Sequence, residues 1–114
     1  MTEERLSTYG DLLPQLRRAL EHLAAPAGEQ YQYLRGLRMN NADELALEFD
    51  DVAAAAESAL TDDCRGLLRE LNSALAAMSD RSHAGVWSLE ALSTAPEWAD
   101  VRSRATAALR LLPR

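Results

Sequence analysis

The chain has 114 residues, a typical length for one domain, and its composition of 47% hydrophobic and 26% charged residues is too apolar for intrinsic disorder. Its formal net charge of −6 opposes binding to the phosphates of nucleic acids. We therefore expect a single folded domain over residues 1–114, without a nucleic-acid partner, and any charged partner should be basic.

The composition also indicates the fold class. Isoleucine and lysine are absent, and valine occurs only at Val52, Val86 and Val101. Strands favour β-branched and aromatic residues, whereas the abundant Ala, Leu, Arg and Glu enter helices at little cost. The sequence predicts an all-α bundle of about four to five helices.

The first predicted helix begins at Asp11, which caps it, and ends near residues 25–26. Pro14 fits its first turn, where a missing N–H costs little, and four leucines then form one stripe: Leu13, Leu16, Leu20 and Leu23. Residues 2–9 are expected to add a preceding helical turn, with Gly10 as the joint.

Residues 29–39 predict a second helix that ends before the pair Asn40-Asn41. Asn41 and Glu44 have the spacing of a capping box at the start of a third helix. Apolar residues recur along it at helical spacing as far as residue 60: Leu45, Phe49, Val52, Ala53, Ala56 and Leu60.

Thr61 is expected to cap a fourth helix, with Asp62 and Asp63 in the first turn, where they favour the positive end of the helix dipole. Its stripe is Cys64, Leu67, Leu68, Leu71, Leu75 and Met78. So short a connection predicts that the third and fourth helices form an antiparallel hairpin.

Residues 79–85 have loop composition, and residues 86–93 are expected to lead into a short helical piece. Thr94, Pro96 and Glu97 then predict a capped start for the last helix. Its apolar face is Trp98, Val101, Ala105, Ala108, Leu109 and Leu112.

The start of the chain, residues 1–5, has neither the positive flank nor the apolar stretch of a signal peptide, and no uncharged run approaches the ~20 residues that span a bilayer. Cys64 is the single cysteine, which excludes an intramolecular disulfide and fits a reducing compartment. We expect a cytoplasmic protein with no membrane contact.

No motif for catalysis is present. The two histidines, His22 and His83, lie in no recognisable motif, and we expect surface or structural roles, with His22 on the solvent side of its helix. The glycines are too scattered to form a phosphate-binding loop. The chain is therefore not expected to be an enzyme.

Cys64 and a pair of glutamates are the remaining candidates for chemical sites. A first-turn cysteine can be reactive, but Asp62 and Asp63 oppose a thiolate here, so we expect Cys64 to be a small buried hydrophobe. Glu44 and Glu48 share a helix face, yet the Glu-x-x-His elements of a di-metal bundle site do not occur. We expect no metal and no cofactor.

Acidic residues are concentrated in one part of the chain. Between Arg38 and Arg65 there are eight of them and no basic residue: Asp43, Glu44, Glu48, Asp50, Asp51, Glu57, Asp62 and Asp63. On a helical wheel two strips flank Leu47, which points away from the core: Glu44, Glu48 and Asp51 on one side, and Asp43, Asp50 and Glu57 on the other. Glu44, Glu48 and Asp51 do not lie on the apolar stripe, so their replacement by arginine should leave folding intact.

Such a surface is either merely solvated or a docking face for a basic partner, with Leu47 as an apolar contact inside an acidic frame. The predicted protein-binding residues are Asp43, Glu44, Leu47, Glu48, Asp50 and Asp51.

The run from residue 33 to residue 78 resembles the small helical immunity proteins of the MafI type, which protect bacteria against polymorphic toxins. The resemblance lies in Leu45-Ala46-Leu47-Glu48 and in Leu60-Thr61-Asp62-Asp63, the entry to the next helix. It implies an inhibitor of a toxin, and the acidic residues between Arg38 and Arg65 would then cover a basic surface of that toxin. The alternative is a helical assembly module that forms homo-oligomers, with its charge serving solubility.

Overall fold

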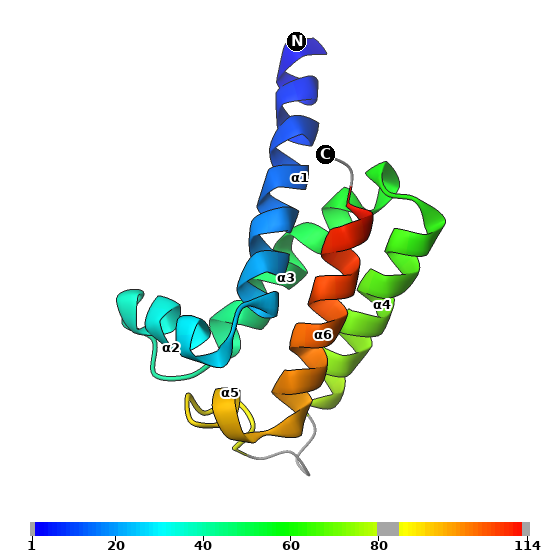
Figure 1. Ribbon diagram of the computed structural model, residues 1–114. Coiled ribbons are helices and arrows are strands. Elements are labelled where there is room, and N and C mark those ends of the chain that lie inside the picture. The colour runs from blue at the N-terminus through cyan, green and yellow to red at the C-terminus, as the bar shows by residue number, and fades with distance from the viewer. Residues whose placement is uncertain (1, 80–84, 113–114) are drawn as a thin grey trace.

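The computed structural model describes the backbone of residues 2–79 and 85–112 and, within these ranges, the side chains from Leu12 onward. The elements are helical, in an all-α bundle as predicted (Figure 1). They are α1 (Thr2–Ala24), α2 (Ala27–Gly36), α3 (Asp43–Ala56), the 3-10 turn η1 (Glu57–Ala59), α4 (Asp62–Ala77), α5 (Ala91–Thr94) and α6 (Pro96–Leu111). No helix in these ranges is both long and apolar enough to cross a membrane.

Four helices enclose one core. α1 packs against α3 and α6, and α6 also packs against α4 (Figure 1). The predicted stripes supply the core: Leu16, Leu20 and Leu23 from α1, Leu45, Phe49 and Val52 from α3, Leu68, Leu71 and Leu75 from α4, and Trp98, Val101 and Ala105 from α6. Each large side chain stabilises the fold by about 1.5–3 kcal/mol when it is fully buried. The C-terminal helix α6 therefore shares one core with α1, α3 and α4.

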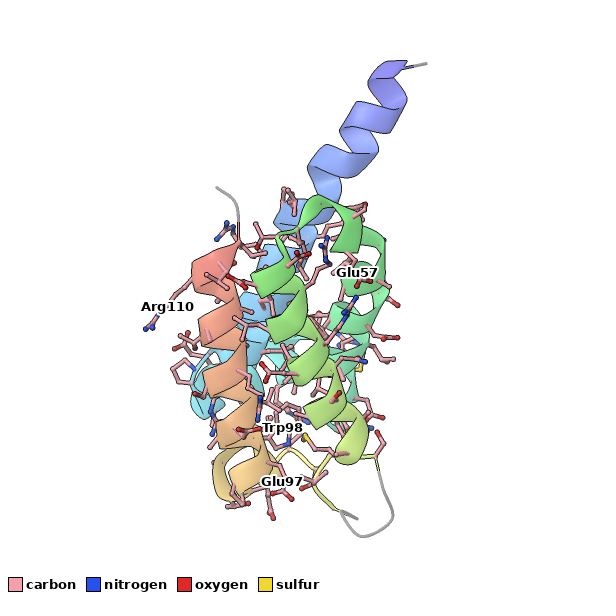
Figure 2. The ribbon with its side chains drawn as sticks, turned by 90° about the vertical axis from the view of Figure 1, so that its right-hand side faces the viewer. Glu57, Glu97, Trp98 and Arg110 are labelled. Carbon is pink, nitrogen blue, oxygen red and sulfur yellow. The ribbon has the colours of Figure 1, made fainter. Side chains whose placement is uncertain are left out.

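The predicted start of the first helix was wrong, because α1 runs without a break from Thr2 to Ala24 and has Pro14 inside it. Gly10 is helical and Asp11 does not cap the helix. Pro14 has no N–H to donate to the Gly10 carbonyl, but its φ of about −65° is compatible with helical backbone. The first turns of α1 extend beyond the body of the bundle in both views (Figures 1 and 2).

α2 ends at Gly36, three residues before the expected end. Arg38 has a positive φ of 62°. The N–H of Met39 donates to the Leu34 carbonyl at 2.9 Å, and the N–H of Arg38 donates to the Arg35 carbonyl at 2.9 Å. This is a Schellman motif, in which an arginine occupies the left-handed position usually taken by glycine.

The predicted capping box at Asn41 was also wrong, because the N-cap of α3 is Ala42, which is fully buried. The Asn41 side chain accepts a hydrogen bond from the N–H of Asp43 at 3.0 Å, and the N–H of Ala42 donates to the Trp87 carbonyl at 2.8 Å. The backbone at the start of α3 is therefore held by a hydrogen bond to the segment around Trp87, which is distant in the sequence.

The junction between α3 and α4 follows the prediction in part. α3 ends at Ala56 rather than at Leu60, and η1 follows it. Thr61 Oγ1 accepts a hydrogen bond from the N–H of Cys64 at 3.2 Å, which confirms the predicted cap. The two helices run in opposite directions, as expected of a hairpin, but they approach each other much less closely than α4 approaches α6 (Figure 1).

The segment before α6 differs in detail. α5 covers only Ala91–Thr94, and Ala95 is the N-cap of α6, because the Thr94 hydroxyl donates to the Glu90 carbonyl instead of capping. Two tryptophans anchor this segment: Trp98 Nε1 donates to the Val86 carbonyl at 2.7 Å, and Trp87 Nε1 donates to the Met78 carbonyl at 3.0 Å. Residues 80–84, with His83, lie outside the described residues.

Candidate functional site

The outward face of α3 carries the predicted docking residues. Leu45, Phe49, Val52 and Ala56 face the core. Leu47 lies on the opposite side of the helix and is 53% exposed. Three aspartates beside it are exposed as well: Asp43, Asp50 and Asp51. Leu47 thus lies beside exposed acidic residues as predicted, but Glu44 and Glu48 of the predicted docking face are half-buried.

The charge of this frame is not neutralised by the described part of the chain. Asp43, Asp50 and Asp51 form no ion pair with a described residue. Asp43 lies in the first turn of α3, where the helix dipole favours it, but Asp50 and Asp51 lie beyond the reach of that effect. These carboxylates are therefore open to a cation from outside.

Glu48 is in a different position from the other predicted residues. Its Oε1 lies 2.9 Å from Nδ1 of His22, and its Oε2 accepts a hydrogen bond from the Tyr33 hydroxyl. The rings of His22 and Tyr33 are stacked, with centroids 3.9 Å apart. Because these residues come from α1, α2 and α3, Glu48 connects three helices and is only partly accessible.

Two sequence expectations change with this contact. His22 is half-buried between helices rather than on the solvent side of α1. Glu48 lies off the apolar stripe, yet it has an internal role, so its replacement would disturb the fold. Sequence spacing alone had no signal for either, because His22 and Glu48 are 26 positions apart.

The environment of Tyr33 changes its acidity. Burial raises the pKa of its hydroxyl well above the ordinary value, and the hydrogen bond to Glu48 and the negative charge of Glu48 raise it further. Glu44 adds to this increase in the pKa of Tyr33, whereas Arg18 opposes it. Tyr33 therefore acts as a neutral hydrogen-bond donor over the physiological range.

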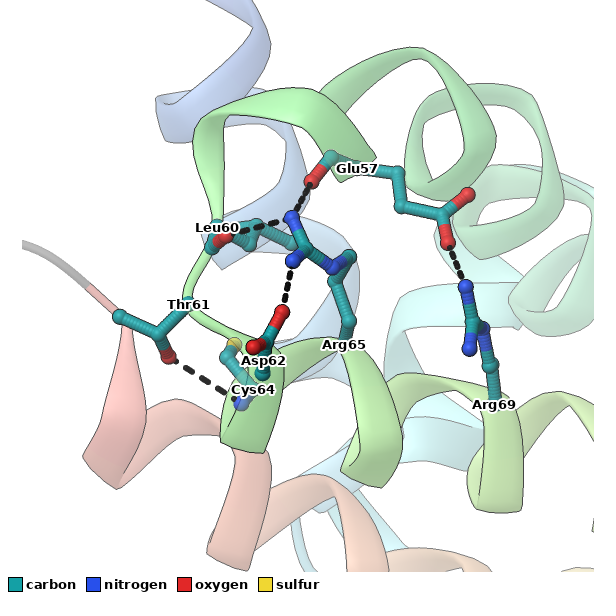
Figure 3. Close-up of polar contacts among 7 residues, drawn as sticks. All are labelled: Glu57, Leu60, Thr61, Asp62, Cys64, Arg65 and Arg69. Atoms are coloured by element: carbon teal, nitrogen blue, oxygen red, sulfur yellow. Dashed lines mark hydrogen bonds and ion pairs between the residues drawn. The ribbon is translucent and has the colours of Figure 1, made fainter.

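At the other end of α3, the arginines of α4 hold the helix junction (Figure 3). Arg65 Nη1 donates to the carbonyls of Glu57 at 3.2 Å and Leu60 at 2.8 Å, and its other terminal nitrogen pairs with Asp62. Arg69 Nη2 lies 2.6 Å from Glu57 Oε1, and the Arg69 side chain is much more exposed than that of Arg65. Arg65 is thus tied to the backbone at the end of α3, whereas Arg69 is held by one surface ion pair.

A groove of about 400 Å³ lies between α3 and α4. The α3 side provides Asp50, Ala53 and Ala54, the α4 side provides Ser73, and Phe49 and Leu68 lie deepest. The groove explains why the predicted hairpin is only loosely paired. The helical wheel missed it, because the wheel describes one helix and the groove needs two.

Neither thiol chemistry nor a metal site is suggested by the described residues. Cys64 is fully buried, as expected, and burial raises the pKa of its thiol. Among the described residues, no three or more His, Cys, Asp or Glu side chains gather where they could hold a metal ion.

Comparisons with protein-family models, with curated proteins and with solved structures find no match for this chain. Proposals about its function therefore rest on the geometry described above and on the sequence pattern of residues 33–78.

Proposed function

We propose that the chain is a protein-binding module that uses the outward face of α3, and that it acts as an immunity-type inhibitor of a basic partner. Leu47 is the observation that carries this proposal. It is the most exposed of the large hydrophobic side chains in the described residues, and it lies opposite a fully buried stripe of the same helix.

The acidic frame around Leu47 suits a basic surface, such as the active cleft of a nuclease. Carboxylates that lack an internal partner attract a cationic surface over several ångströms and accelerate association. An apolar contact in the middle of the frame is shielded from water when the partner binds, and it then slows dissociation. The resemblance of residues 33–78 to MafI-type immunity proteins supports the same reading.

The test begins by capturing partners from a lysate of the source cells, with the wild-type chain and with Leu47→Arg as baits. A protein that is enriched by the wild-type bait and lost with the variant is then purified, and its binding is measured by surface plasmon resonance. We expect Leu47→Ala to raise the dissociation rate and Asp43→Arg with Asp51→Arg to lower the association rate. The wild-type association rate should fall as salt is added.

Leu111→Ala is the matched control, because Leu111 is an exposed leucine on α6, away from this face. It should leave both rates unchanged. Equal kinetics for the wild type, Leu47→Ala and the double aspartate variant would refute the docking face. Inhibition is tested separately, by measuring whether the chain blocks the activity of the captured protein.

Homo-oligomeric assembly is the second candidate function. The observation that favours it is the extension of the first turns of α1 beyond the body (Figures 1 and 2). Light scattering combined with gel filtration would distinguish the two candidates. A stable dimer that is lost when residues 1–10 are deleted would favour assembly, and a monomer at every concentration would exclude it.

A further inference from the structure

Small side chains lie on both walls of the groove between α3 and α4. Ala53 and Ala54 line it on α3, and Ser73 lines it on α4. Phe49, at 1% exposed, and Leu68, at 5% exposed, form an apolar floor. Its volume lies within the range of about 300–1,000 Å³ that is usual for ligand pockets.

The edges of the groove differ in charge and in how firmly they are held. Asp50 stands on the α3 edge and has no ion-pair partner among the described residues. Arg65 is held by two backbone carbonyls and a carboxylate, so it is not available to a ligand. Arg69 is 74% exposed and is held at Glu57 by a surface ion pair, a type of contact that contributes only about 0–1 kcal/mol.

An incoming cation could therefore replace Arg69 at Glu57 at little cost. Asp50 on α3 and Glu57, the first residue of η1, are seven positions apart in the sequence, and both line the groove. Two basic side chains spaced by about two helical turns would match them, with an apolar side chain between them over Phe49 and Leu68. This pattern is typical of an amphipathic helix that binds in a groove.

We propose that the groove between α3 and α4 binds an amphipathic basic helix of the protein partner. An apolar side chain of that helix contacts Phe49 and Leu68, and one of its basic residues pairs with Asp50. Another basic residue displaces Arg69 from its ion pair with Glu57. This inference rests on the proposed function, since it identifies the kind of segment that the partner presents. A second copy of the chain is a poor occupant, because two chains with a net charge of −6 each repel one another.

The probe is a helical peptide of about 15 residues that has leucine at positions i, i+3 and i+7 and arginine on the flanks. A peptide with glutamate in place of arginine is the charge control. Binding to the full chain is measured by titration calorimetry and mapped by amide chemical shifts. We expect shifts at Ala53, Ala54 and Ser73, and no binding of the acidic peptide.

Two neighbouring alanines provide a matched pair of variants. Ala54 and Ala55 are both exposed on α3, but only Ala54 lines the groove. Ala54→Trp should fill the groove and weaken binding by about tenfold or more, whereas Ala55→Trp should change it by less than about twofold. Ser73→Trp repeats the block from the α4 side, and circular dichroism checks that each variant is folded.

Charge variants test the exchange of ion pairs. Asp50→Arg should weaken the binding of the basic peptide more than Asp51→Arg, because Asp51 does not line the groove. Arg69→Ala should strengthen binding by a few-fold, since it removes the cation that competes for Glu57. A loss of affinity in Arg69→Ala would contradict this exchange.

The groove inference is overturned if Ala54→Trp and Ser73→Trp bind the basic peptide as the wild type does, or if the shifts centre on Leu47 and leave Ala53 and Ser73 unmoved. The second of these results would still agree with the proposed function, because the peptide would then bind the outward face of α3. Unchanged kinetics of Leu47→Ala with the captured partner would reject the proposed docking face without bearing on the peptide result.

Discussion

Glu48 Oε1 lies 2.9 Å from Nδ1 of His22, and this contact ties the acidic helix α3 to α1. The other carboxylate oxygen of Glu48 accepts a hydrogen bond from the hydroxyl of Tyr33 on α2. One acidic side chain of the predicted docking face therefore holds three helices together, whereas Asp43, Asp50 and Asp51 are exposed. Charge reversals across this face thus have two different effects, one on binding and one on folding.

Glu48 and Asp51 should respond differently to replacement, although they lie on the same flank of α3. Glu48→Ala removes two hydrogen bonds to a charged acceptor and should lower the free energy of unfolding by about 1–3 kcal/mol. Asp51→Ala should change it by less than about 0.5 kcal/mol, as is usual for a surface substitution. Urea denaturation followed by circular dichroism measures both. Equal values for the two variants would mean that the Glu48 contacts do not stabilise the fold.

Tyr33 predicts a loss of stability at alkaline pH. The folded state favours the neutral phenol, so its contribution is complete below about pH 10, the ordinary pKa of tyrosine, and is lost as the pH rises toward the raised pKa of the folded state. The free energy of unfolding of the wild type should therefore fall more steeply above about pH 10 than that of Tyr33→Phe. If the two curves run parallel from pH 8 to pH 11, the phenol of Tyr33 is not protected.

Gln30 should be intolerant of replacement, because it is a buried polar residue with three partners. Its Nε2 donates to the carbonyls of His22 and Leu23, each at 3.0 Å, and its Oε1 accepts from Arg102 Nη1 at 3.1 Å. Gln30→Leu leaves the carbonyls at the end of α1 without this donor and should cost at least about 1–3 kcal/mol.

Two further substitutions sharpen the Gln30 prediction. Gln30→Glu keeps an acceptor for Arg102 but sets a carboxylate against two carbonyls, so it should also destabilise the protein. Gln32→Leu, on an exposed position of α2, is the control and should be nearly neutral. Thermal denaturation ranks the variants, and a Gln30→Leu protein as stable as the wild type would show that the network is dispensable.

Arg38→Gly should stabilise the protein, because Arg38 has a φ of 62° at the end of α2. A non-glycine residue pays about 1–2 kcal/mol for this conformation, and glycine adopts it freely, so we expect a net gain of about 0.5–1 kcal/mol. Arg35→Gly, inside the last turn of α2, should instead lose about 0.5–1 kcal/mol. Opposite signs for the two arginines, measured by urea denaturation, would confirm the Schellman motif.

The sequence predicted the features that depend on neighbours along the chain. The all-α class, the buried faces of α1, α3, α4 and α6, and the Thr61 cap all follow from helical spacing or from a side chain three residues away. The exposure of Leu47 follows in the same way, because a residue opposite a buried stripe must face outward. Such features repeat every turn, so they can be read from one helix at a time.

Only the tertiary structure decided which helices meet and what their polar groups do there. The N-cap of α3 is Ala42, whose N–H donates to the distant Trp87 carbonyl, and Glu48 has an internal role because α1 and α2 bring His22 and Tyr33 to it. The groove is lined by side chains from both α3 and α4. Helical spacing shows which face of a helix turns inward, but a hydrogen bond or a gap between two helices depends on side chains from both.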